Sequence, residues 1–141
     1  MSKTLLDQDG IGWAIVGNLG CKGFQNGSSP IDNRSEKEKK DQGGKPLYQN
    51  LKTQCYIALT DPISESKINL SRMERWREEI TQELDAYEEI DIDKEGPRRI
   101  TPKEKIKEII GRSPDFADMI AMRMWFELAP MTKKKFRFNA I

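Results

Sequence analysis

The beginning of the chain alternates short hydrophobic runs with glycines. A run over residues 3–6 ends on two leucines, and the polar, glycine-containing segment 7–12 follows it. Hydrophobic side chains then recur over 13–19 up to Gly20, and a second short run occupies 21–24. We predict a strand, a glycine turn, a helix that ends at Gly20, and a second short strand.

A long polar stretch separates this beginning from the next hydrophobic pattern. Residues of about 26–46 are rich in glycine, serine, asparagine and charged side chains, which predicts a flexible loop with too little apolar surface to order itself. Beyond it, a helix is predicted over 47–59, and Asp61 and Pro62 are expected to end it. Its apolar stripe recurs every four residues, at Leu47, Leu51, Cys55 and Leu59.

Two capping-box patterns mark the starts of the next helices. Residues 71–74 have the spacing in which a serine hydroxyl and a glutamate carboxylate each accept a backbone N–H, and this helix is expected to reach about Tyr87. Residues 101–104 repeat the pattern with a proline at the first helical position, and Gly111 is expected to end the helix. The segment 91–97 is interpreted as a turn between two short extended pieces.

The last helix has a start signal of its own. Residues 113–115 are a serine that can cap, a proline suited to the first turn, and an aspartate near the positive end of the helix dipole. The helix is expected to end at 129–130, where a basic tail with two phenylalanines follows. We therefore divide the chain into one domain over 1–128 and a basic tail over 129–141.

Composition excludes several classes of protein. A third of the residues are charged but the net charge is only +1, so the chain as a whole makes no strong electrostatic case for nucleic acid. No run approaches the roughly 20 apolar residues of a membrane span, and the first residues lack the apolar core of a signal peptide. We predict a soluble, cytoplasmic protein that does not bind membranes.

The sequence contains no histidine. Its absence removes the commonest general base, the Ser-His and Cys-His pairs, and most zinc sites. Catalysis would therefore need carboxylates, which favour hard cations such as Mg²⁺ or Mn²⁺. Cys21 and Cys55 are far apart without C-x-x-C spacing, so they indicate small buried side chains and not a zinc knuckle or a disulfide framework.

One candidate site is an acid that precedes a glycine turn. Asp7 stands at the expected end of the first strand and is followed by Gly10 and Gly12. In open α/β sheets, ligands bind at the carboxyl ends of strands, and glycines there let a backbone approach a phosphate. A tight turn with solvated acids explains the same residues. A dinucleotide-binding fingerprint does not fit, because Ile15 stands where its third glycine would be.

A second candidate site lies at the start of the last helix. Asp115 and Asp118 are three residues apart and so share one face of the helix. Two acids there could hold a cation while the helix end attracts phosphate. The alternative is that Asp115 only complements the helix dipole and Asp118 is exposed to solvent. Arg112 and Arg123 could contact DNA or pair with these acids.

Four short motifs occur in a fixed order along the chain. They are residues 7–16, 23–26, 48–56 and 111–118. In this order they resemble the nuclease end of the large terminase subunits of phages and prophages. The resemblance extends from Leu5 to about Leu128.

The resemblance implies the back half of a ribonuclease-H-like α/β domain, with a short sheet flanked by helices and one sheet edge open. In that family the acids bind two divalent cations, Mg²⁺ or Mn²⁺, and the enzyme cuts concatemeric DNA during packaging. The strand acid of the family falls on Asp7, with Asp9 as an alternate metal ligand, and its late acid falls on Asp115 or Asp118. Asp7, Asp115 and Asp118 are therefore the candidate catalytic residues, and all four acids are candidate metal ligands.

The resemblance also implies partners and a place of action. These are double-stranded DNA, the portal and the small terminase subunit, in the cytoplasm of the bacterial host. The open edge of the sheet makes self-association a further expectation.

Two parts of the family pattern are missing from this sequence. The first catalytic acid of the family lies on an earlier strand, and its ATP-binding motor carries a P-loop. We therefore expect a fragment with an incomplete metal site, and whether it is an enzyme by itself stays open. The alternatives are a non-catalytic prophage remnant or module that binds DNA or a partner, and another ribonuclease-H-like nuclease such as a resolvase or transposase.

Overall fold

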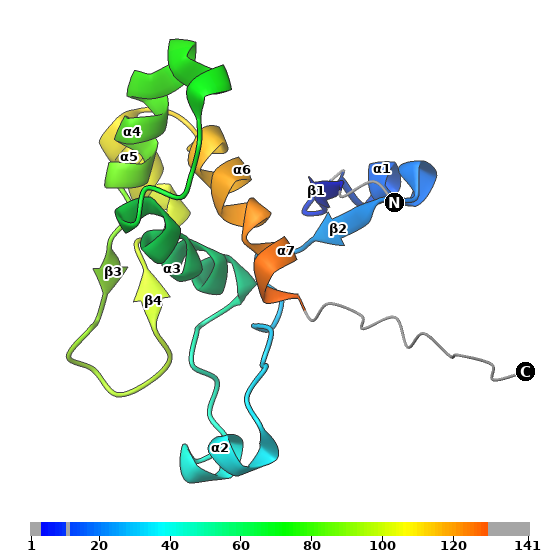
Figure 1. Cartoon of the computed structure of the whole chain (residues 1–141), viewed down its shortest axis with the longest axis vertical. Coiled ribbons are helices and arrows are strands. Elements are labelled where there is room, and N and C mark those ends of the chain that lie inside the picture. The colour runs from blue at the N-terminus through cyan, green and yellow to red at the C-terminus, as the bar shows by residue number, and fades with distance from the viewer. Residues whose placement is uncertain (1–3, 11, 130–141) are drawn as a thin grey trace, which may run out of the picture.

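A computed structural model describes residues 4–10 and 12–129 of the chain. The fold is mixed α/β, and helices form its larger part. Figure 1 shows a small strand–helix–strand unit near the N-terminus beside a body of helices that also contains a β-hairpin. The α/β class expected from the sequence is confirmed at this level.

The N-terminal unit consists of β1 (Leu5–Asp7), α1 (Gly12–Leu19) and β2 (Lys22–Phe24). The two strands pair in parallel along their whole length, and the N–H of Gln8 extends the pairing by donating to the last carbonyl of β2. The helix ends at Gly20, which has the positive φ of +60° that glycine adopts without strain. The predicted order of strand, glycine turn, helix and strand is confirmed.

The glycine turn between β1 and α1 has a steric cause. A β-carbon at Gly12 would lie 1.9 Å from the backbone oxygen of Asp7, closer than two such atoms can approach. Gly10 has a φ of +67°, in the left-handed region that most side chains disfavour. These two glycines let the first turn of α1 pack directly against the end of β1.

The body consists of helices and one hairpin. Its elements are α3 (Leu51–Ser64), the 3-10 helix η1 (Ser71–Trp76), α4 (Arg77–Asp85), β3 (Glu89–Ile90), β4 (Arg99–Ile100), α5 (Lys103–Ile110), α6 (Asp115–Arg123) and α7 (Trp125–Leu128). The strands β3 and β4 are antiparallel, which confirms the predicted turn between two extended pieces. Helix α6 packs against both α3 and α4.

The hydrophobic core lies between these helices. Its buried members are Phe24, Leu51, Cys55, Tyr56, Leu59, Ile80, Ala117, Ile120, Ala121 and Met124. Phe24 is the last residue of β2, so its ring joins the N-terminal unit to the body. The thiol of Cys55 is fully buried, and burial raises its pKa to about 12, as expected for a small core side chain. Cys21 is only half-buried.

Helix α1 leaves large hydrophobic side chains in solvent. Trp13 is 67% exposed and Leu19 68% exposed, and Ile15 is exposed as well. Among the described strands, β1 and β2 pair only with each other. Because a two-stranded sheet is marginally stable in water, this unit depends on what it packs against.

The helix predicted over 47–59 is displaced along the chain. Asn50 caps α3, because its side-chain oxygen accepts the N–H of Thr53 at 2.8 Å. Leu47 therefore lies outside the helix and is exposed. Pro62 does not end α3 but lies inside its last turns.

Neither of the two predicted capping boxes forms. The hydroxyl of Thr101 is buried and accepts the N–H of Glu88 at 3.2 Å, while Pro102 takes the N-cap position of α5. The residues 71–74 lie in the 3-10 helix η1, and α4 begins only at Arg77. In both places the expected hydroxyl has another position or another partner.

The stretch over 26–46 contains a helix that the sequence analysis missed. Helix α2 (Glu36–Asp41) begins with a capping box, in which the Ser35 hydroxyl accepts the N–H of Glu38 and the Glu38 carboxylate accepts the N–H of Ser35. None of its residues is buried. Without an apolar stripe, the hydrophobic pattern could not reveal it.

The end of the described chain departs from the prediction in two respects. The single last helix is divided into α6 and α7, which meet at Met124, and Pro114 stands at the N-cap of α6 in place of Ser113. The predicted end of α5 is confirmed, since Gly111 follows it with a φ of +75°. The basic tail beyond 129 lies outside the described residues. Within those described, no helix is long and apolar enough to cross a membrane.

Candidate functional site

Two acids at the end of β1 are held together by one asparagine. The side-chain amide of Asn26 donates to Asp9 at 2.8 Å and lies 3.4 Å from each carboxylate oxygen of Asp7. The backbone N–H of Asp9 donates to Asp7 at 2.9 Å. Asn26 follows β2 as Asp7 ends β1, and parallel strands place these ends at the same edge of the sheet.

This arrangement, the Asp7–Asp9–Asn26 group, faces solvent. Both carboxylates belong to exposed residues, so water reaches them freely. Two negative charges are therefore kept close together with an amide as their shared neutral partner. Carboxylate and amide oxygens are ligands that Mg²⁺ and Mn²⁺ accept.

Asp118 lies in a different environment. Its side chain is only 11% exposed, in contrast to the exposed position that one interpretation of the sequence gave it. The hydroxyls of Tyr56 and Tyr87 donate to its Oδ1 at 2.7 Å and 3.3 Å. The ammonium of Lys52 lies 2.7 Å from the same oxygen, and that of Lys103 lies 2.6 Å from Oδ2. We call these five side chains the Asp118 cluster.

The cluster favours the ionised form of its aspartate. Burial alone would raise the pKa of Asp118, but the hydrogen bonds and charges of Lys103 and Lys52 outweigh burial and leave the pKa below its usual value. Burial, with the charge of Asp118 added, raises the pKa of Tyr56 and of Tyr87. Both phenols therefore keep their protons and act as donors.

The two lysines differ in how strongly water is removed from them. Lys52 is 14% exposed, and burial lowers its pKa in spite of its contact with Asp118. Burial also acts to lower the pKa of Lys103, which is 36% exposed, but the hydrogen bond and charge of Asp118 raise it above its usual value. The like charges of the two ammonium groups add to the lowering at Lys52.

The two acidic groups are neighbours in space. The backbone N–H of Lys52 donates to the carbonyl oxygen of Asn26 at 3.2 Å, which joins the Asp7–Asp9–Asn26 group to the Asp118 cluster. The charge of Asp7 adds to the raised pKa of Lys103, and at Lys52 it partly opposes the lowering that burial causes. Asp115 is exposed and acts only at a distance, on Lys103. The fold thus brings Asp7 and Asp9 together and places the Asp118 cluster beside them. Within the described residues, the exposed Asp115 makes no direct contact with either group.

The arginines considered for DNA contact have other partners. Arg112 pairs with Glu83, a fully buried acid of α4. The other oxygen of Glu83 accepts the N–H of Ala117 at 2.9 Å, so Glu83 caps α6 from a neighbouring helix. Arg123 pairs with Glu127 at 2.8 Å. Neither arginine pairs with Asp115 or Asp118.

The described residues supply too few acidic side chains for a complete two-metal site. Among the described residues, no group of three or more Asp, Glu, Cys or His side chains is placed to hold a metal ion. Asp7 and Asp9 offer two carboxylates, and the oxygens of Asp118 are occupied by lysine and tyrosine donors. The donor types fit a hard cation at Asp7 and Asp9, and Asp118 could join only if a lysine moved away.

Sequence reasoning did not assign a role to several of these residues. Lys52 and Tyr56 are one helical turn apart within the third motif, and Asn26 ends the second motif. Their presence in the motifs was the available signal. Tyr87 and Lys103 lie outside all four motifs, so nothing in the sequence pattern marked them.

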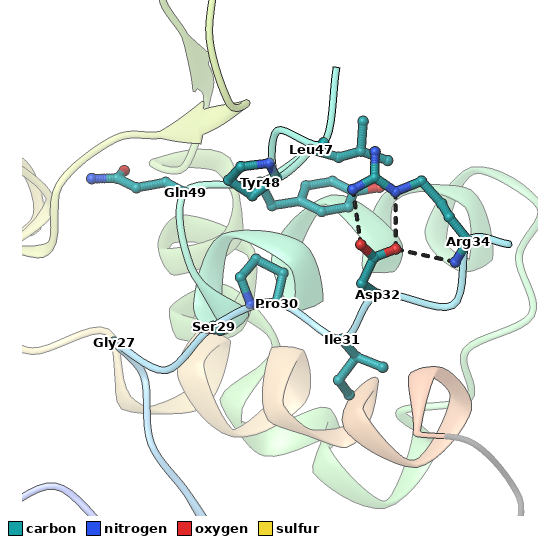
Figure 2. A pocket seen from close by; sticks show the side chains of 11 residues that line it. Gly27, Ser29, Pro30, Ile31, Asp32, Arg34, Leu47, Tyr48 and Gln49 are labelled. Atoms are coloured by element: carbon teal, nitrogen blue, oxygen red, sulfur yellow. Dashed lines mark hydrogen bonds and ion pairs between the residues drawn. The ribbon is translucent and has the colours of Figure 1, made fainter. Parts of the chain in front are cut away.

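The structure also contains a cavity away from this site. Figure 2 shows it between the segments 27–34 and 44–49, with a volume of about 380 Å³. Arg34 forms two side-chain hydrogen bonds with Asp32 on its wall, both of 2.9 Å, and this contact lowers the pKa of Asp32 to about 2. Both charges of the wall are thus satisfied by each other, and the cavity holds no cluster of reactive groups.

Comparison of the chain with known protein families, curated proteins and solved structures found no match.

Proposed function

We propose that this chain is the C-terminal part of a ribonuclease-H-like, metal-dependent DNA nuclease domain of the terminase kind. The observation that supports it most is the placement of the Asp7–Asp9–Asn26 group at the carboxyl end of a parallel strand, beside the Asp118 cluster. That edge of an α/β sheet is where ligands bind. The four ordered sequence motifs, which resemble those of large terminase subunits, also support this proposal.

Each residue of the candidate site has its own role in this proposal. Asp7 and Asp9 would hold a hard cation, and Asn26 keeps their carboxylates side by side. Mg²⁺ or Mn²⁺ bound there supplies the charge stabilisation and water activation that phosphodiester hydrolysis needs. Asp118 is a further ligand once its lysines are drawn to another anion. By the same resemblance, the substrate is double-stranded DNA and the partners are the portal and the small terminase subunit.

A manganese titration tests the cation site directly. We expect weak binding that broadens the backbone NMR signals of residues 7–9 and 26 first, because Mn²⁺ relaxes nearby nuclei. Asp7→Asn should abolish this broadening, and the exposed Asp115→Asn serves as the matched control. Broadening that begins elsewhere, or that survives Asp7→Asn, would contradict the proposed site.

A nicking assay tests the reaction. With Mn²⁺ and a supercoiled plasmid, any cleavage by the chain is expected to be slow, because only part of a two-metal ligand set is present. That cleavage should be lost in Asp7→Asn and unchanged in Lys105→Gln, an exposed lysine of α5. Cleavage that persists in Asp7→Asn would mean that another site cuts the DNA.

A module that binds a partner without catalysis is the second candidate. Its support is the apolar surface of α1, where Trp13, Ile15 and Leu19 are exposed. If this function holds, Trp13→Ala should weaken association of the chain with itself or with a packaging protein, while Asp7→Asn should not. Analytical ultracentrifugation of both variants separates the two candidates.

A further inference from the structure

A second cavity opens beside the Asp118 cluster. It has a volume of about 230 Å³ and lies between the start of α3, strand β4 and the start of α5. Its polar lining comes from Gln49, Asn50, Lys52, Thr53, Thr101 and Lys103. A water occupies about 30 Å³ in the liquid, so the cavity has room for a phosphate-sized group with several waters.

The lining carries more positive than negative charge. Lys52 and Lys103 come from different helices and both contact the single carboxylate of Asp118. An ammonium group has three N–H donors, so each lysine can hold a further acceptor without leaving Asp118. The charge of Asp7 reaches both lysines and that of Asp115 reaches Lys103, but both acids are exposed and act through solvent, which screens them.

The shared carboxylate also fixes the two lysines in place. With Asp118 at 2.7 Å and 2.6 Å, the ammonium groups are oriented before any ligand arrives. Tyr56 and Tyr87 flank one of them, with the Lys52 nitrogen 5.5 Å and 5.3 Å from the two ring centres. A preorganised pair of cations loses less side-chain freedom when it binds an anion than two free lysines would.

We propose that this cavity binds a phosphate group of a DNA backbone, with Lys52 and Lys103 as positioning residues. The proposal rests on the proposed function for the source of the phosphate, because the adjacent Asp7–Asp9–Asn26 group is where that function places the chemistry. A phosphate held here sets a DNA strand beside Asp7, because the N–H of Lys52 donates to the carbonyl oxygen of Asn26 at 3.2 Å and the Asn26 side chain contacts Asp7.

The test uses the whole chain in buffer with EDTA, so that no divalent cation takes part. A short DNA duplex and, separately, inorganic phosphate are titrated while NMR follows the backbone signals of residues 49–53 and 101–103. We expect both ligands to shift these signals, and Lys103→Gln to weaken DNA binding about tenfold. The slope of log affinity against log salt concentration should also become shallower by about 0.9, the value for one lost phosphate contact.

Three variants keep the result interpretable. Lys103→Arg retains the positive charge and should restore most of the DNA affinity, because a guanidinium also binds phosphate. Lys105→Gln removes an exposed lysine of the same helix and should have little effect. Asp7→Asn removes a negative charge near the lysines, so it should leave phosphate binding intact or tighten it. Because the nuclease proposal expects Asp7→Asn to lose DNA cleavage, the two proposals can fail independently of each other.

Two outcomes overturn the inference. If Lys103→Gln and Lys105→Gln weaken DNA binding equally, the cavity does not bind the backbone. If inorganic phosphate shifts the cavity signals but the duplex does not, the site takes a small free phosphate and the DNA assignment fails. Urea unfolding of Lys103→Gln checks that a loss of affinity is not a loss of the fold.

Discussion

The two acidic groups are built in opposite ways. Asp7 and Asp9 lie in the strand–helix–strand unit, exposed to water and tied to each other through Asn26. Asp118 lies in the helical body, nearly buried, and is held by lysine and tyrosine side chains from three other segments. One group is open and adaptable, whereas the other is fixed by its surroundings.

The difference extends to the regions around them. The body encloses a continuous core between α3, α4 and α6, whereas α1 leaves Trp13 and Leu19 in solvent. Few buried apolar contacts mean a low free energy of local opening. We therefore expect the N-terminal unit to open without the body, although Phe24 anchors its second strand in the core.

The largest effect is expected when Asp118 loses its charge. Asp118→Asn leaves Lys52 as a buried, unpaired cation and should cost about 4 kcal/mol of unfolding free energy at pH 7. The pKa of Asp118 is lowered in the fold, so its contribution is complete above the unfolded value of about 3.9 and is lost as the pH falls through the folded value. Urea unfolding at pH 7 and pH 3 measures both.

The control for this variant is Asp115→Asn, an exposed acid on the same helix face, which should change stability by less than about 0.5 kcal/mol. The difference in unfolding free energy between wild type and Asp118→Asn should be smaller at pH 3 than at pH 7. An equal difference at both pH values would show that the shape of the side chain matters and its charge does not.

A matched pair of leucines tests the two regions against each other. Leu59→Ala in the body removes a side chain that is 2% exposed and should cost about 3 kcal/mol. Leu19→Ala in α1 removes one that is 68% exposed and should cost less than about 0.5 kcal/mol. Chemical unfolding measures both. A large cost at Leu19 would mean that another surface covers α1 in solution.

A smaller effect, confined to the N-terminal unit, is expected from Gly12→Ala. The added β-carbon would meet the backbone oxygen of Asp7, so α1 must move away from β1 at a cost of about 2 kcal/mol. Hydrogen exchange should quicken over residues 4–24 and stay unchanged in α3 and α6. Gly17→Ala, where nothing lies within 4 Å, is the control and should slow exchange in α1. Uniform quickening of the whole chain would contradict the independence of the two regions.

Local signals in the sequence predicted local structure well. Gly10 and Gly111 have the positive φ that favours glycine, and Gly12 stands where a β-carbon would meet the backbone oxygen of Asp7, so the predicted turn and the predicted end of α5 are both confirmed. The capping boxes failed for a physical reason. At Thr101, the hydroxyl that should cap a helix accepts a hydrogen bond from the backbone N–H of Glu88, just before β3.

The candidate site was predictable only in part. Asp7 could be placed at a strand end from its neighbours, because strand and turn are local patterns. The surroundings of Asp118 join residues as far apart as Tyr56 and Tyr87, 62 and 31 positions before it. One sequence does not reveal such pairings, because they depend on how α3 and α6 pack.

The two cysteines have a practical consequence. Only the thiolate reacts with alkylating reagents, and burial makes that form scarce at Cys55, deep in the body. Cys21 lies half-buried between α1 and β2. Its thiol is therefore partly open to the reagent and should react first, while alkylation of Cys55 must wait until the core of the body comes apart. Mass spectrometry of a single alkylation time course would then report the opening of the body through Cys55, with Cys21 as the internal reference for an accessible thiol.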